Sequence, residues 1–197
     1  MAGDSKNIMA LDLQLSDREM FLIGMIVAHW GSLEHEVFTQ TLLSFDTPQE
    51  QADGLPKAMN NIQFTQVLSL WKERVVDKCK GKRSTALREV HDALVDLKEP
   101  RDALIHGMWL WSPNNMDRIS TVRVRKRNVI TTHFDSDYLQ DFAFRLAKLN
   151  FMIRYPRGAI DLAASRQREG FYMSRKGIQL MSELAEAKAG SGESADA

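Results

Sequence analysis

The sequence predicts a mainly α-helical fold, an antiparallel helical bundle of four to five helices with one inserted β-hairpin between the third and fourth helices. Three observations lead to this prediction. Apolar residues recur at spacings of three and four along four separate stretches, which is the period of one helix face. One stretch alternates instead, which is typical of strands. The chain has 197 residues, 44% hydrophobic and 26% charged, enough for one globular domain with its own core.

The first helix is predicted to begin just after Ser16, because Ser16 and Glu19 have the spacing of a capping box. Residues 1–15 carry little pattern and are expected to form an N-terminal extension. Glu34 follows Trp30 by four residues, so it lies at the edge of the apolar stripe of this helix. There it is either a solvated side chain or the partner of an arginine on a neighbouring helix. The stripe consists of Leu22, Ile26, Trp30, Leu33 and Val37.

The third helix carries the longest apolar seam of the chain, and Arg101 occupies one position of that seam. An arginine on a buried stripe needs a carboxylate, a phosphate or dense hydrogen bonding, because an unpaired buried charge costs several kcal/mol. We therefore expect Arg101 to be partly buried and within salt-bridge distance of Glu34. The second helix precedes this one, after a polar loop at residues 45–56, and its apolar face carries Phe64, Leu68, Trp71 and Val75.

Two stretches of the chain are strongly basic. Residues 78–83 connect the second and third helices and hold four positive charges, which suit either a phosphate contact or a solvated connecting loop. The other stretch is the tip of the hairpin, which alternation of valine and arginine predicts at about residues 117–134. This tip is either a phosphate-binding cluster or an edge protected by charge. Its basic residues are Arg123, Arg125, Lys126 and Arg127.

The fourth helix is predicted to be capped by Ser136 and to stop near Tyr155, because Pro156 follows. Residues 160–187 are helix-prone, and residues 189–197 are small and acidic, so we expect the latter to be a disordered tail. Residues 16–188 are then predicted to form a single helical domain. The apolar stripe of the fourth helix consists of Leu139, Phe142, Leu146, Leu149 and Ile153.

The end of the third helix groups three residues that carry chemistry: Arg101, Asp102 and His106. Asp102 and His106 are four residues apart and are expected to be neighbours on one helix face, where the carboxylate orients the imidazole. Gly107 is the usual type of residue at a helix end, so His106 is expected in the last turn. The helix dipole there favours the protonated imidazole.

The pattern Arg101-Asp102-x-x-x-His106, at the end of an amphipathic helix and followed by Gly-x-Trp, resembles the signature of HEPN domains. The segment Trp30-Gly-Ser-Leu-Glu34 is similar to the first-helix segment of HEPN-like proteins, in which a glutamate supports the active-site arginine. The element order over residues 16–153 is similar to that of uncharacterised bacterial members of the family. This resemblance covers one short motif and the order of the elements.

The resemblance implies metal-independent cleavage of RNA, in which the 2′-oxygen attacks the adjacent phosphate and a 2′,3′-cyclic phosphate results. His106 is implied as general acid or base, Arg101 as the group that stabilises charge on the phosphate, and Asp102 as the residue that orients the histidine. Glu34 is implied as their support. A toxin or a defence component with a neutralising protein partner is the corresponding biological expectation.

Family members commonly pair, so the resemblance also implies a homodimer in which Arg101 and His106 of two chains share one cleft. The apolar residues just after the motif are then expected at the interface: Met108, Trp109 and Trp111. Two alternatives to a nuclease stay open. One is a non-catalytic HEPN-like module that binds RNA, a nucleotide or a protein partner, and the other is a purely structural dimerisation domain.

Composition restricts the other classes of function. The 26 basic and 26 acidic side chains cancel, so any RNA contact must be a local patch rather than an overall field. Cys79 is the single cysteine, which excludes an intramolecular disulfide framework and a cysteine cluster for zinc. We see no metal-ligand spacing and no Gly-rich phosphate loop, so no cofactor is expected. No apolar stretch reaches the ~20 residues of a membrane span, and a cytoplasmic location is expected.

Overall fold

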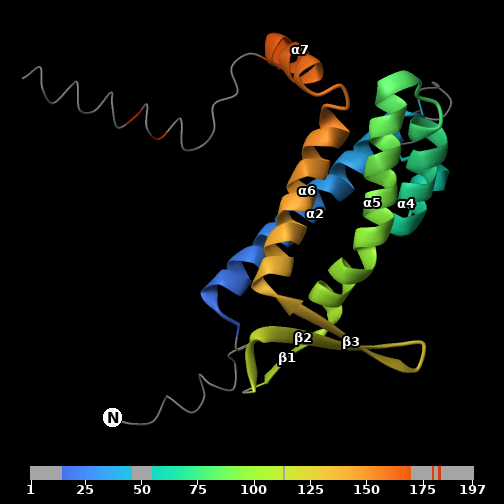
Figure 1. Cartoon of the computed structure of the whole chain (residues 1–197). Helices are drawn as coiled ribbons and strands as arrows, with labels where there is room; N and C mark the ends of the chain where they lie inside the picture. The colour runs from blue at the N-terminus through green and yellow to red at the C-terminus, as the bar shows by residue number, and fades with distance from the viewer. Residues whose placement is uncertain (1–14, 46–54, 113, 170–178, 180–181, 183–197) are drawn as a thin grey trace, which may run out of the picture. The chain divides into compact units, whose positions relative to one another are not determined.

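The computed structural model describes residues 15–45, 55–112, 114–169, 179 and 182 (Figure 1). These residues form a mainly helical fold with a small three-stranded antiparallel sheet, which confirms the predicted mainly α class. The chain divides into two compact units, Met1–Gly158 and Ala159–Ala197, where the sequence suggested one domain over residues 16–188. The second unit contributes helix α7 (Ala159–Glu169). The predicted tail at residues 189–197 lies outside the described residues.

Helix α2 (Asp17–Leu43) begins with the predicted capping box. The Ser16 hydroxyl accepts a hydrogen bond from the Glu19 backbone amide at 3.3 Å, and the Ser16 amide donates to the Glu19 carboxylate at 2.7 Å. Both bonds satisfy backbone donors that a helix start leaves without partners. All five predicted stripe residues are buried: Leu22, Ile26, Trp30, Leu33 and Val37.

Two further helices help to close the core, the first packed on α2 and the second packed on the helix that follows the sheet. A 3-10 turn η1 (Lys57–Met59) leads to helix α4 (Phe64–Trp71), which continues into a π-helical turn η2 (Lys72–Val76). Helix α5 (Gly81–His106) follows, with Pro100 in its interior. The apolar seam predicted for it is buried at Leu87, Val90, Leu94, Leu97 and Leu104.

Helix α6 (Ser136–Arg154) completes the helical part of the first unit. Its N-cap is Asp135 rather than the predicted Ser136, because the Asp135 carboxylate accepts a hydrogen bond from the backbone amide of Tyr138 at 2.7 Å. The helix ends at Arg154, before Pro156, as predicted. Its stripe is buried at Leu139, Phe142, Leu146, Leu149 and Ile153.

The helix directions differ from the mainly antiparallel bundle that the sequence suggested. Contacts between α2 and α6 advance in the same direction along both helices: Arg18 with Gln140, His29 with Asn150, and Ser32 with Arg154. Helix α4 also runs with α2, because Phe64 contacts Trp30 whereas Trp71 donates a hydrogen bond to Gln40. Only α5 among these four runs the opposite way (Figure 1). The sheet joins the end of α5 to the start of α6, so these two consecutive helices are antiparallel (Figure 1).

The insert before α6 contains three strands, β1 (Met108–Ser112), β2 (Asn115–Arg125) and β3 (Asn128–Asp135), in the order β1-β2-β3. Strands β2 and β3 form the predicted hairpin, closed by a two-residue turn in which Lys126 and Arg127 have φ of 48° and 68°. Strand β1 was not predicted. It starts directly after Gly107, whose extended backbone (φ −86°, ψ 150°) turns the chain out of α5.

On β2, the face of the sheet toward the helices carries Arg123, and the opposite face carries Val124. The face toward the helices is buried at Ile119, Thr121 and Phe134, and Arg123 shares this face with them because its position has the same parity as Ile119 and Thr121. Val124 lies on the other face and is 74% exposed. Alternation by itself cannot tell which face of a strand meets the core.

Candidate functional site

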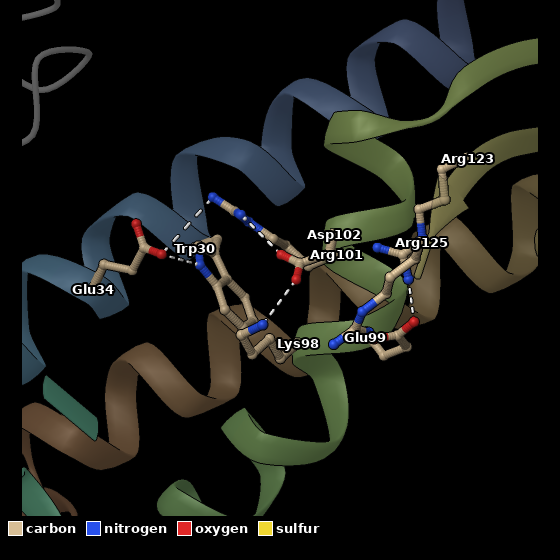
Figure 2. Close-up of polar contacts among 8 residues, drawn as sticks. All are labelled: Trp30, Glu34, Lys98, Glu99, Arg101, Asp102, Arg123 and Arg125. Carbon is tan, nitrogen blue, oxygen red and sulfur yellow. Dashed lines mark hydrogen bonds and ion pairs between the residues drawn. The ribbon is translucent and has the colours of Figure 1, made fainter. Parts of the chain in front are cut away.

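Arg101 lies where α5 meets α2, and its surroundings confirm the prediction of a partly buried arginine beside Glu34 (Figure 2). Its side chain is 22% exposed, and its Nη2 atom lies 3.8 Å from Oε1 of Glu34. Its Nη1 atom donates a hydrogen bond to Oδ1 of Asp102 at 3.1 Å. The guanidinium carbon lies 5.4 Å from the centroid of the Trp30 ring, within cation–π range. Two carboxylates and one indole therefore hold this guanidinium.

Trp30 is a site residue that the sequence suggested only as core. It is fully buried, and its indole nitrogen donates a hydrogen bond to Oε1 of Glu34 at 2.6 Å. The same carboxylate oxygen faces Arg101, so Trp30 orients the acceptor while its ring contacts the cation (Figure 2). The signal was present in the four-residue spacing of Trp30 and Glu34, which places them on one helix face.

Asp102 is held by cations on its own helix. Lys98 donates to Oδ2 of Asp102 at 2.9 Å, and Arg101 donates to the other oxygen (Figure 2). Burial raises the pKa of the Asp102 carboxyl, but the hydrogen bonds and charges of Lys98 and Arg101 outweigh burial and bring that pKa below its ordinary value of 3.8. Asp102 is therefore an anion at neutral pH, and Lys98 is a second site residue that the sequence did not suggest.

His106 is not oriented by Asp102, which corrects the expected carboxylate–imidazole contact. The two residues are four apart on α5, but neither a hydrogen bond nor an ion pair joins them in the structure. Side chains on a helix lean toward its N-terminus. The Asp102 carboxylate therefore forms ion pairs with Lys98 and Arg101, which precede it on α5. His106 is the last residue of α5, as predicted, and its side chain is exposed.

The basic residues of the hairpin divide into two pairs. Arg123 and Arg125 donate to the two carboxylate oxygens of Glu99 on α5, the second at 2.7 Å (Figure 2). The Arg123 side chain is only 11% exposed, so it joins the sheet to the helix. Lys126 and Arg127 form the exposed turn between β2 and β3. Arg123 would have to leave Glu99 before it contacted a phosphate, whereas the turn residues are accessible already.

Two kinds of feature are absent from the residues that the structure describes. No group of three or more histidine, cysteine, aspartate or glutamate side chains is arranged to hold a metal ion, and no helix is long and apolar enough to cross a membrane. Comparison with protein-family models, with curated proteins and with solved structures finds no match to the chain.

Proposed function

We propose that this chain is a metal-independent endoribonuclease of HEPN type, built on a helical bundle with an inserted sheet. The observation that carries the proposal is the arrangement around Arg101. A glutamate from the first helix lies beside the arginine, as the resemblance to HEPN domains implied, and the exposed His106 ends the same helix. A cation and a titratable imidazole near one helix end are the two groups that this cleavage needs.

The proposed reaction needs no group beyond those of the protein, the RNA and water. A base removes the proton of the 2′-hydroxyl, the 2′-oxygen bonds to the phosphorus, and the bond from phosphorus to the 5′-oxygen of the next nucleotide breaks. A proton delivered to that 5′-oxygen completes the step and leaves a 2′,3′-cyclic phosphate and a 5′-hydroxyl end. His106 serves as base or acid, and Arg101 stabilises the negative charge on the phosphate oxygens.

The contacts change the role proposed for Asp102. Its carboxylate bonds Arg101 and Lys98, so it positions the arginine rather than the histidine. Among the basic residues of the hairpin, Lys126 and Arg127 are the first candidates for contacts with the RNA backbone, because Glu99 already binds the other two. A cytoplasmic toxin or defence component with a neutralising partner remains the proposed setting.

A non-catalytic module that binds RNA, a nucleotide or a protein is the second candidate, and one observation favours it. Arg101 is held by two carboxylates while His106 has no orienting partner among the residues described. In a binding module, the two carboxylates around Arg101 would stabilise the fold, and no oriented histidine would be needed. Only the nuclease would cleave RNA, so a cleavage assay distinguishes the two candidates.

The test is cleavage of single-stranded RNA by the purified chain in the presence of EDTA, with the product ends analysed for 2′,3′-cyclic phosphate. We expect His106→Ala and Arg101→Ala each to abolish cleavage. His133→Ala is the matched control, because His133 is also exposed but bonds Ser120 on the sheet, and it should cleave like the wild type. If the wild type yields no cyclic ends, or His106→Ala yields as many, the nuclease proposal fails and RNA binding without cleavage supports the binding module.

A further inference from the structure

The outer surface of α2 and α6 carries large apolar side chains that the core does not use. Phe144 lies two residues, about 200° of helix rotation, from the fully buried Leu146, and it therefore points away from the core. Phe21 lies about 180° from the fully buried Trp30 by the same measure. Since α2 and α6 run side by side, these residues share one surface. Its exposed apolar members are Phe21 at 65%, Met25 at 37%, Phe144 at 70% and Phe151 at 43%.

The same surface of α2 contains two glycines, Gly24 and Gly31, in the interior of a helix of 27 residues. Glycine in a helix interior is less stable than alanine there, so it needs a reason. A Cβ atom added at either position would meet no atom of the described residues within 4 Å, so packing among these residues does not supply the reason. Missing side chains allow another backbone to come close, which suits a partner helix lying across α2.

The charges on this face of α6 select the partner. Asp141 precedes Phe144 by three residues and Lys148 follows it by four, so all three lie on one stripe. The side chains of Asp141 and Lys148 are exposed, and neither forms a salt bridge with another of the described residues. In an identical helix that runs antiparallel about a two-fold axis beside Phe144, each Asp141 faces the Lys148 of the other copy. A stripe with opposite charges on the two sides of an apolar centre is thus complementary to itself.

The size of the surface agrees with such a pairing. An aromatic side chain covers about 150–250 Å², so the four exposed apolar residues present on the order of 400 Å². A standard interface covers about 800 Å² per partner, of which the polar rim is a large part. Gly24 lies at about the same height as Phe144, because Arg18 contacts Gln140 and His29 contacts Asn150. The two-fold axis therefore brings the apolar centre of α6 and a glycine of α2 to the middle of one interface.

We propose that two copies of this chain pair through the outer surface of α2 and α6, antiparallel, with Phe144 and Gly24 at the centre. This pairing does not depend on the nuclease proposal. It also differs from a dimer in which two motifs share one cleft, because Arg101 contacts the side of α2 that faces α5 rather than its outer side. Each copy would keep its own Arg101 and His106 open to its own RNA.

The first experiment measures the mass of the full chain by light scattering between about 1 and 100 µM. The wild type should be a dimer, and Phe144→Asp should shift it to monomer or raise the dissociation constant at least tenfold. Circular dichroism should be unchanged, because Phe144 supports no core contact. Val124→Asp is the matched control, since Val124 is equally exposed but lies on the sheet, and it should remain dimeric. A monomeric wild type, or a dimer that Phe144→Asp does not weaken, overturns the proposal.

A charge exchange tests the partner and its direction. Asp141→Lys and Lys148→Asp should each weaken the dimer, because each creates two like-charge contacts across the axis. The double variant restores opposite charges and should regain most of the wild-type affinity. Gly24→Leu should fold at least as stably as the wild type yet dimerise more weakly, because only the partner would meet the added side chain. If the double variant is no better than the single ones, or Met108→Asp alone breaks the dimer, the two copies pair elsewhere and the proposal is wrong.

Discussion

The guanidinium of Arg101 lies 3.8 Å from the carboxylate of Glu34, across the contact between α5 and α2. The indole of Trp30 donates a hydrogen bond to the same carboxylate oxygen. Arg101 of α5 is thus in contact with both Glu34 and Trp30 of α2. The site is therefore part of the packing between these helices as well as a candidate reaction centre. Stability and activity are expected to respond to different substitutions within it.

Glu34→Ala is expected to lower the free energy of unfolding by about 1–3 kcal/mol, because it removes one of the two carboxylates beside Arg101 and leaves the Trp30 indole without its acceptor. Glu36→Ala is the matched control on the same helix. It removes the partner of Arg154, whose side chain is 40% exposed, and the acceptor of a hydrogen bond from Gln40 on the same helix, so its cost should stay below about 1 kcal/mol. Urea unfolding followed by tryptophan fluorescence measures both. Equal losses for the two variants would contradict a supporting role for Glu34.

Asp102→Asn is expected to make the stability of the protein less sensitive to acid. The pKa of Asp102 in the folded chain is below its ordinary value of 3.8, because Lys98 and Arg101 outweigh the opposing effect of burial. A lowered folded pKa means that the charged carboxylate stabilises the fold above pH 3.8 and that this contribution disappears as the pH falls through the folded pKa.

The measurement is the difference in free energy of unfolding between wild type and Asp102→Asn, at pH 7 and at about pH 3. The wild type should be the more stable at pH 7, and the difference should shrink at the lower pH. A difference that is the same at both pH values would show that the ionisation of Asp102 does not contribute.

Arg123→Ala is expected to destabilise the protein more than Arg125→Ala. Both arginines bond Glu99, but the side chain of Arg123 is 11% exposed and that of Arg125 is 51% exposed. We expect a loss of about 1–3 kcal/mol for the buried arginine, which includes its packing, and less than about 1 kcal/mol for the exposed one. Thermal unfolding of the two variants gives the comparison, and the opposite order would show that Arg123 is not the link between sheet and helix.

Gly107→Ala is expected to cost about 1–3 kcal/mol, because the added methyl overpacks a tight contact. Its Cβ would lie 2.4 Å from the Cβ of Thr121 and 2.6 Å from the carbonyl oxygen of Ala103, neither of which is the end of a flexible side chain. Gly31→Ala meets no atom within 4 Å and should instead raise stability by about 0.5–1 kcal/mol. Chemical denaturation compares the two, and a harmless Gly107→Ala would mean that β2, which carries Thr121, is able to move away from the end of α5.

Local rules determined the helices and part of the site. The capping box at Ser16 and the apolar stripes rest on interactions between residues a few positions apart, so the sequence alone predicts them. The same logic identified Arg101, because a charge on a buried stripe requires a partner and Glu34 stood at the edge of the neighbouring stripe. Pro156 marked the end of α6 for an equally local reason.

Competition within α5 decided the partners of Asp102, and tertiary structure decided the contacts of Arg123 and Gly107. Spacing along the helix allowed Asp102 to contact Lys98, Arg101 or His106. In the structure its carboxylate pairs with the two cationic side chains, Lys98 and Arg101, and not with the histidine. The packing of the sheet on α5 decides which face of β2 points inward, and therefore that Arg123 pairs with Glu99. An alternating sequence pattern does not contain this information. Gly107 matched the residue type of a helix end, but its structural reason is the close approach of Thr121, a residue fourteen positions later that only the folded chain brings near.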